Sequence, residues 1–194
     1  STAEKNSMYG FEIYDGTIIN CTAKNNYYDT DLEKKFDDSY NPIYDTFINP
    51  GKAIGFYIDH DGIIIDSVAK NNEATGIRLE GNSKAINCKS EQNNNNGFGL
   101  HGKSIAENCI AIANKYNGFE PKSNSIVNNS ESYSNKRGFL LKDNSVAENI
   151  TAHFNKIGLY MKHNSKLKTT AELCQNYKHD LVIPKKGPAI EQGT

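Results

Sequence analysis

A four-residue pattern of glycine, an apolar residue, a variable residue and a second apolar residue returns at a nearly constant interval along this chain. After an early copy at Gly10, the copies are spaced 21, 21, 21, 20 and 20 residues apart and begin at Gly55, Gly76, Gly97, Gly118, Gly138 and Gly158. A fixed period near twenty residues is typical of a solenoid, in which each repeat buries its apolar face by stacking on its neighbours. The pattern therefore constrains the fold much more closely than the function.

Each repeat contains three short runs of alternating residues. In the repeat that begins at Gly97, Phe98 and Leu100 point inward while the residues between and after them point outward, as the period of two in a strand requires. A turn at 102–104, a second strand and a third short strand follow. Such rungs, stacked in parallel about 4.8 Å apart, form a parallel β-helix. A leucine-rich repeat would need an L-x-x-L-x-L pattern and a helical return, and neither is present.

Two columns of polar residues repeat with the same period. Because asparagine tolerates left-handed backbone and its amide can bond the equivalent amide one rung away, these columns predict hydrogen-bonded ladders at the corners. The first consists of Asp66, Asn87, Asn108, Asn129 and Asn149, and the second of Asn72, Asn93, Asn114, Asn135 and Asn155. The sequence thus predicts an all-β, single-stranded parallel β-helix of about seven rungs with 20–22-residue repeats. We expect it over residues 1–184, with a polar tail at 185–194.

Composition limits the classes of partner. The 194 residues carry a net charge of −1, which gives no general attraction to nucleic acid. No apolar run approaches the roughly 20 residues that span a bilayer. The first residues match the middle of a repeat, so we expect this domain to be part of a larger polypeptide.

Three of the four cysteines share one inward position. Cys21, Cys88 and Cys109 alternate there with serine and isoleucine in other rungs, which predicts small core side chains rather than disulfides. No C-x-x-C pair is present, and we predict no metal site from the cysteines.

The period is interrupted by an insertion at residues 27–53. Solenoids accommodate insertions as loops that leave a corner, often on the binding face. Tyrosines suit stacking against sugar rings, and this insertion offers Tyr27, Tyr28 and Tyr40 as candidate substrate-binding residues. The alternative is a loop without function, or one that only covers an edge.

The outward residues of the first strands are the main candidates for chemistry. The middle rungs place on one surface a group that we call the wall, which consists of Tyr57, Asp59, Arg78, Glu80, His101, Glu120 and Lys122. Neighbouring rungs are close enough for these groups to shift one another's pKa, so the wall is a candidate catalytic site. The same surface, here called the first-strand face, adds Tyr14, Lys142 and Tyr160 as candidate binding residues. The alternative is a solvated face whose charges prevent aggregation.

The repeats resemble the right-handed parallel β-helix of the pectate-lyase-like superfamily over residues 3–183, and this resemblance implies the handedness. Within that superfamily they are weakly similar to mannuronan C5-epimerases, whose Tyr-Gly-Phe-Asp-Pro-His strand places Asp and His in the sugar groove. Tyr9-Gly10-Phe11 matches the first three positions, with Glu12 and Tyr14 in place of Asp and His. The run 118–121 matches Gly-Phe-acid-Pro, and Lys122 follows in place of His.

The resemblance implies an acidic polysaccharide, such as a uronan, as the partner. Catalysis would begin with removal of the proton at C5, with a cation such as Arg78, or Ca²⁺ held by Asp59 and Glu80, neutralising the carboxylate. Elimination then gives a lyase and reprotonation an epimerase. The alternative is a non-catalytic β-helix for carbohydrate binding, adhesion or spacing in a surface, secreted or phage-fibre protein. We expect an extracellular, cell-surface or periplasmic location.

Overall fold

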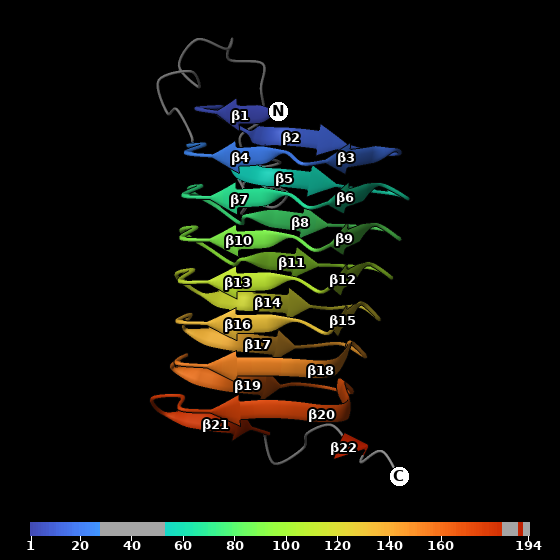
Figure 1. Ribbon diagram of the computed structural model, residues 1–194. Coiled ribbons are helices and arrows are strands. Elements are labelled where there is room, and N and C mark those ends of the chain that lie inside the picture. The colour runs from blue at the N-terminus through green and yellow to red at the C-terminus, as the bar shows by residue number, and fades with distance from the viewer. Residues whose placement is uncertain (28–52, 184–189, 192–194) are drawn as a thin grey trace, which may run out of the picture.

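The protein is a parallel β-helix of about seven turns, with repeats of about 21 residues. A computed structural model describes residues 1–27, 53–183 and 190–191, and the first and last described strands lie at opposite ends of the stack (Figure 1). All strand pairs are parallel, which confirms the solenoid predicted from the period. The handedness of the coil stays a prediction. None of the described residues forms a helix that is long and apolar enough to cross a bilayer.

Each rung contributes one strand to each of three stacks. The first stack consists of β2 (Tyr9–Ile13), β5 (Ile54–Ile58), β8 (Ile77–Leu79), β11 (Phe98–Leu100), β14 (Asn117–Pro121), β17 (Arg137–Leu141), β19 (Ile157–Met161) and β21 (His179–Val182). The second begins with β3 (Thr17–Ile19), β6 (Ile63–Ile65), β9 (Lys84–Ile86), β12 (Ile105–Glu107) and β15 (Ile126–Asn128). The third begins with β1 (Thr2–Glu4), β4 (Thr22–Lys24), β7 (Val68–Lys70), β10 (Lys89–Glu91), β13 (Ile110–Ile112) and β16 (Glu131–Tyr133).

In the last two rungs the second and third strands merge. β18 (Val146–His153) and β20 (Lys166–Cys174) each run through both positions and join the two stacks into one sheet of 14 strands. The pairing of β18 with β20 shifts register between Glu148 and Ile150, where β20 holds one extra residue. Within the expected tail, β22 (Ile190–Glu191) pairs with the first half of β20, so the chain returns to the end of the stack.

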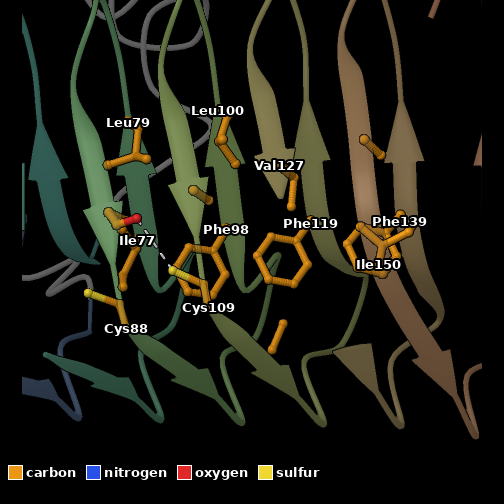
Figure 2. Packing of buried hydrophobic residues seen from close by; sticks show 14 of the residues in the cluster. Ile77, Leu79, Cys88, Phe98, Leu100, Cys109, Phe119, Val127, Phe139 and Ile150 are labelled. Atoms are coloured by element: carbon orange, nitrogen blue, oxygen red, sulfur yellow. Dashed lines mark hydrogen bonds between the residues drawn. The ribbon is translucent and has the colours of Figure 1, made fainter. Parts of the chain in front are cut away.

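The core is a column of aromatic and aliphatic side chains inside the coil (Figure 2). Phe98, Phe119 and Phe139 stack nearly parallel, with ring centroids 4.7 and 5.0 Å apart. Cys88 and Cys109 are buried free thiols beside this column, as predicted, and Cys21 is partly buried and packs against it. The inward residues of every first strand therefore build the fold, and they leave the outward residues free to vary.

The glycine that opens each first strand is required by a close approach between rungs. A Cβ on Gly55 would lie 2.5 Å from the carbonyl oxygen of Gly76 and 2.8 Å from Nδ2 of Asn72. Real Cβ atoms do not approach so closely, so the corner amide and the neighbouring backbone together exclude any side chain here. The recurring glycine is thus a consequence of both the buried asparagine beside it and the close backbone of the next rung.

The second asparagine column forms a continuous ladder, whereas the first column shows two separate hydrogen bonds between rungs: Asn87 donates Nδ2 to Oδ1 of Asp66, and Asn149 donates Nδ2 to Oδ1 of Asn129, both at 3.2 Å. In the first column the residues have positive φ, 51° at Asn108, and stand at exposed corners. In the second, buried column, successive amides donate Nδ2 to Oδ1 at 2.8–3.2 Å from Asn6 through to Asn176. The left-handed backbone in this column falls on the preceding residue, such as Gln92 or Ala113, and not on the asparagine itself. The role that these asparagines share along the stack is hydrogen bonding.

Candidate functional site

The register of the first stack aligns the wall as predicted. Tyr57 pairs with Arg78, Arg78 with Gly99 and Gly99 with Glu120, on the adjacent strands β5, β8, β11 and β14. The inward neighbours of these residues are fully buried, which fixes the wall residues on the outside of the sheet. The structure therefore brings the catalytic candidates onto one continuous surface.

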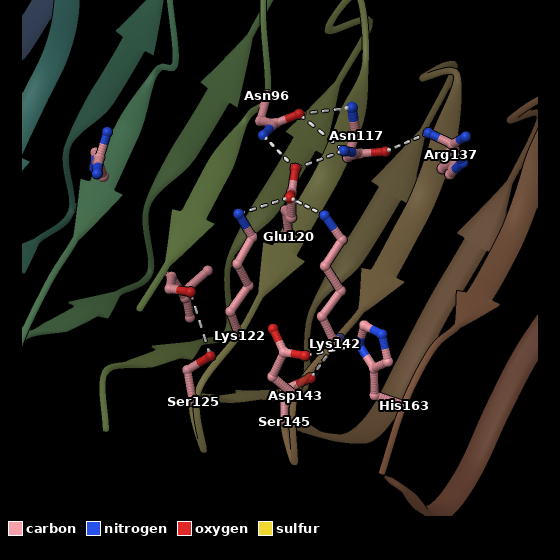
Figure 3. A network of polar contacts seen from close by, with 12 residues as sticks. Asn96, Asn117, Glu120, Lys122, Ser125, Arg137, Lys142, Asp143, Ser145 and His163 are labelled. Atoms are coloured by element: carbon pink, nitrogen blue, oxygen red, sulfur yellow. Dashed lines mark hydrogen bonds and ion pairs between the residues drawn. The ribbon is translucent and has the colours of Figure 1, made fainter. Parts of the chain in front are cut away.

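Glu120 lies at the centre of a hydrogen-bond network (Figure 3). Its Oε2 accepts a hydrogen bond from Nδ2 of Asn96 and another from Nδ2 of Asn117, both at 2.8 Å. Its Oε1 lies 2.7 Å from Nζ of Lys142 and 3.1 Å from Nζ of Lys122. Burial opposes ionisation of this carboxyl, but the hydrogen bond from Lys142 and the two positive charges outweigh it and lower its pKa to about 2. A carboxylate that is so acidic, and engaged by four donors, is a poor proton acceptor, so Glu120 serves to position the two lysines.

Arg78 is held between an acid and an aromatic ring. Its Nε lies 2.7 Å from Oε1 of Glu80, and its guanidinium carbon stands 6.0 Å from the centre of the Tyr57 ring. Burial, together with the negative charges of Asp59 and Glu80, raises the pKa of Tyr57 to about 12. The Tyr57 hydroxyl thus keeps its proton at neutral pH and can act only as a donor or acid.

His101 is the wall residue best suited to accept a proton. Burial lowers its pKa below 6.5, and the charges of Lys122 and Arg78 act in the same direction while Glu80 opposes them. The imidazole is therefore neutral at pH 7, with a free nitrogen lone pair. Beside it, Gly99 places no side chain in the wall, a gap that we call the Gly99 notch; Gly99 itself is buried, and a Cβ there would meet Cγ2 of Thr75 at an ordinary contact distance of 3.7 Å.

Asp59 and Tyr14 lie side by side at the upper end of the wall. The Asp59 carboxylate accepts the backbone N–H of His60 at 2.6 Å, and its second oxygen lies 3.5 Å from that imidazole. The exposed Tyr14 hydroxyl donates to Glu12 at 3.0 Å. Since Glu80 is already paired with Arg78, a Ca²⁺ ion held by Asp59 and Glu80 would have to compete with that guanidinium; such a site stays a prediction.

Below the wall, the first-strand face becomes basic and aromatic. Tyr160 on β19 has the guanidinium of Arg137 at 5.5 Å and Nζ of Lys162 at 5.4 Å from its ring centre. Lys142 stands between these groups and Glu120. Leu140 occupies the outward position of β17 but is only 6% exposed, so it forms an apolar floor between Glu120 and Tyr160.

The tyrosines of the insertion lie apart from this surface or outside the described residues. Tyr27 is exposed at the corner that follows β4. There it lines a shallow groove of about 640 Å³ together with corner amides such as Asn72 and Asn93. Tyr28 and Tyr40 lie outside the described residues.

Two sets of residues were not anticipated from the sequence. Asn96 precedes β11, and Asn117 and Arg137 are the first residues of β14 and β17; all three support the Glu120 network from positions to which the repeat pattern assigns no chemistry. His153, Glu172 and Cys174 meet on the third stack, with donor atoms within 4.8 Å of one another. Their proximity could have been predicted from the sequence only by comparing two columns of outward positions on neighbouring rungs.

A comparison with known proteins found no family model that matches this chain, and no curated protein or solved structure with significant similarity to it.

Proposed function

We propose that the first-strand face binds an acidic polysaccharide. The main support for the proposal is the charge on the lower half of the first-strand face. The outward residues of β14, β17 and β19 are Glu120, Leu140 and Tyr160, and each is followed two places later by a lysine: Lys122, Lys142 and Lys162. At these six positions Glu120 is the single acid. Arg137 adds a fourth cation over the Tyr160 ring. A merely solvated face of a chain with net charge −1 would show mixed signs, whereas this segment has a local excess of positive charge.

The arrangement suits a flat, anionic ring. Tyr160 offers an aromatic surface for stacking, and the flanking cations can pair with carboxylates. The glutamate that holds Lys122 and Lys142 fixes their positions before a ligand arrives, which reduces the ordering cost of binding. Binding to a surface polysaccharide would place the protein at a cell surface, in the periplasm or in the medium.

Binding can be tested with variants that leave the Glu120 network intact. Lys162→Ala and Tyr160→Ala remove one cation and the aromatic platform, and Lys168→Ala removes an exposed lysine from β20 as a matched control. Calorimetric titration with polygalacturonate and alginate should show binding that weakens with added salt, falls about tenfold in the Tyr160 and Lys162 variants and is unchanged in the control, as expected for a loss of about 1.4 kcal/mol. Equal affinity in all four proteins, or equal binding of a neutral glucan, would disprove the proposal.

A second candidate function, uronan lyase or C5-epimerase, rests on the neutral imidazole of His101 beside the Gly99 notch. In this reaction His101 would take the C5 proton, and Arg78 would stabilise the charge that develops on the sugar carboxylate. In a lyase the C4–O bond then breaks to leave a C4=C5 double bond, with a proton from Tyr57 going to the leaving oxygen. In an epimerase Tyr57 would instead return a proton to C5 from the other side. The similarity of residues 9–14 and 118–122 to the mannuronan C5-epimerases supports this candidate.

Catalysis is tested by ultraviolet absorbance of the unsaturated product and by NMR of the sugar, with Ca²⁺ or with a chelator. A lyase or epimerase predicts activity that His101→Ala and Arg78→Ala abolish. Activity that survives both substitutions would show that His101 and Arg78 are not the catalytic residues. Binding without activity would leave the non-catalytic alternative, a carbohydrate-binding, adhesive or spacer module. Activity that the chelator does not reduce would exclude the Ca²⁺ prediction for Asp59 and Glu80.

A further inference from the structure

The outward side of the third stack changes its chemistry in the last two rungs. β18 and β20 pair there so that His153 lies opposite Cys174, and Thr151 opposite Glu172. The imidazole of His153 is mostly covered, with 19% of its side chain exposed, and Cys174 is partly buried. Glu172 is exposed and free to adjust its carboxylate. Three side chains of different type therefore converge at the end of the solenoid.

Two of the separations between their donor atoms are close to those of ligands around one tetrahedral ion. With a Zn–S bond of about 2.3 Å and a Zn–N bond of about 2.0–2.1 Å, a tetrahedral angle places sulfur and nitrogen about 3.6 Å apart. Sγ of Cys174 lies 3.6 Å from Nε2 of His153, and this nitrogen lies 3.6 Å from Oε1 of Glu172. The sulfur is equally far from Nδ1, so a rotation of the imidazole is needed to aim the Nε2 lone pair at a common centre.

The donor set is not a repetition of what the earlier rungs carry. In the same two columns β7 and β10 place Lys70, Lys89 and Glu91, which form ion pairs of 2.9 and 2.6 Å. β13 places two isoleucines there. Cys174 also differs from Cys88 and Cys109, which point into the core, because its rung neighbour His153 stands on the outer side. Packing therefore gives no reason for a cysteine at this position.

We propose that His153, Glu172 and Cys174 bind a Zn²⁺ ion, with a fourth position left open to water. Histidine nitrogen, cysteine sulfur and carboxylate oxygen are the three ligand types that zinc takes in proteins. On binding, the Cys174 S–H bond breaks, a Zn–S bond forms and the proton passes to the buffer. The rings of Tyr133 and Phe154 pack edge-on against the imidazole, with centroids 5.9 and 6.2 Å away, and shield it from water. The ion would join β18 to β20 and so stabilise the end of the stack.

The site can be tested with Co²⁺ as a spectroscopic substitute and with Zn²⁺ itself. Adding Co²⁺ to the reduced protein should produce a thiolate-to-cobalt charge-transfer band and the visible bands of a tetrahedral ion, saturating at one equivalent and displaced by Zn²⁺. Cys174→Ser and His153→Gln should abolish the charge-transfer band. Cys21→Ser, which removes another partly exposed thiol, should retain it. The absence of the band from the wild-type protein, or its persistence in Cys174→Ser, would overturn the proposal.

A second measurement uses the chemical reactivity of the thiols. Saturating Zn²⁺ should slow alkylation of Cys174 by iodoacetamide at least tenfold, measured by mass spectrometry of its peptide, while the rate at Cys21 in the same sample stays constant. The melting temperature should also rise with Zn²⁺ concentration in the wild-type protein and in Cys21→Ser. Equal alkylation of Cys174 with and without Zn²⁺ would contradict the site.

Discussion

Two asparagines adjacent in the chain show how different the task of one residue type can be. Asn93 belongs to the buried ladder: its Oδ1 accepts from both the backbone N and the Nδ2 of Asn72, and its own Nδ2 donates to Oδ1 of Asn114. Asn94 is exposed on the same corner. Both are polar residues in a polar chain, but only the loss of the Asn93 side chain would leave buried donors and acceptors without a partner.

We predict a large difference in stability between the alanine variants of these two asparagines. Asn93→Ala should lower the free energy of unfolding by about 2–4 kcal/mol, since it strands buried donors of Asn72 and an acceptor of Asn114. Asn94→Ala should change it by less than about 0.5 kcal/mol. Urea unfolding followed by circular dichroism measures both. Similar losses for the two variants would show that the ladder contributes little.

Glu120 predicts a specific dependence of stability on pH. Its pKa in the folded protein, about 2, is below the ordinary value of 4.5, so the contribution of its charge is complete above pH 4.5 and is lost as the pH falls toward 2. A difference of this size corresponds to about 3 kcal/mol. Glu120→Gln should therefore be less stable by about that amount at pH 7.

Between pH 4.5 and 2 the profile of Glu120→Gln should be flatter than that of the wild-type protein. The free energy of unfolding in urea across this range is the measurement. Parallel profiles for the two proteins would contradict the depressed pKa of Glu120.

At the scale of the element, the first strand performs two tasks at positions that alternate. Its glycine and inward apolar residues pack the rungs, and its outward residues carry charge and aromatic rings. Gly138 and Gly99 illustrate the two tasks in the same strand type. A Cβ on Gly138 would lie 2.5 Å from the carbonyl oxygen of Gly158, whereas a Cβ on Gly99 would be in ordinary contact at 3.7 Å.

Alanine at these two glycines should therefore have opposite consequences. Gly138→Ala should cost about 3 kcal/mol of stability or more, because backbone atoms of the next rung must move. Gly99→Ala should leave stability within about 0.5 kcal/mol of wild type. It would, however, fill part of the notch beside His101, and any uronan turnover should fall. Thermal unfolding of both variants checks the first two statements, and equal melting temperatures would refute the packing argument.

The strand pattern explains what the sequence could and could not predict. Residues that repeat in every rung, such as Phe98 or Asn114, are fixed by packing, so the period alone located the core, the ladder and the wall. Interactions that occur in a single rung produce no repeating pattern in the sequence. The amides that engage Glu120 belong to Asn96, before β11, and Asn117, the first residue of β14, and the residue type at these positions varies from rung to rung. The partner of His153 is displaced by the extra residue in β20, so neither interaction could be predicted from columns of fixed spacing.

At the scale of the whole molecule, one scaffold presents different chemistry on different sides and at different heights. The first-strand face carries the wall, with groups of both charges, in its upper rungs and a basic, aromatic segment in its lower rungs. The third stack carries ion pairs in the middle and the zinc-type donors near its end. Because each rung contacts only its neighbours, such sites can differ from rung to rung without disturbing the common core.

The most direct test of the account is amide NMR of this 21.6 kDa chain during titration with a short oligogalacturonate. We expect chemical-shift changes to concentrate on β11, β14, β17 and β19, with the largest at Lys142, Tyr160 and Lys162, and to disappear at high salt. Changes confined to the second or third stack, or no changes at concentrations that saturate a weak binder, would contradict the first-strand face as the binding site.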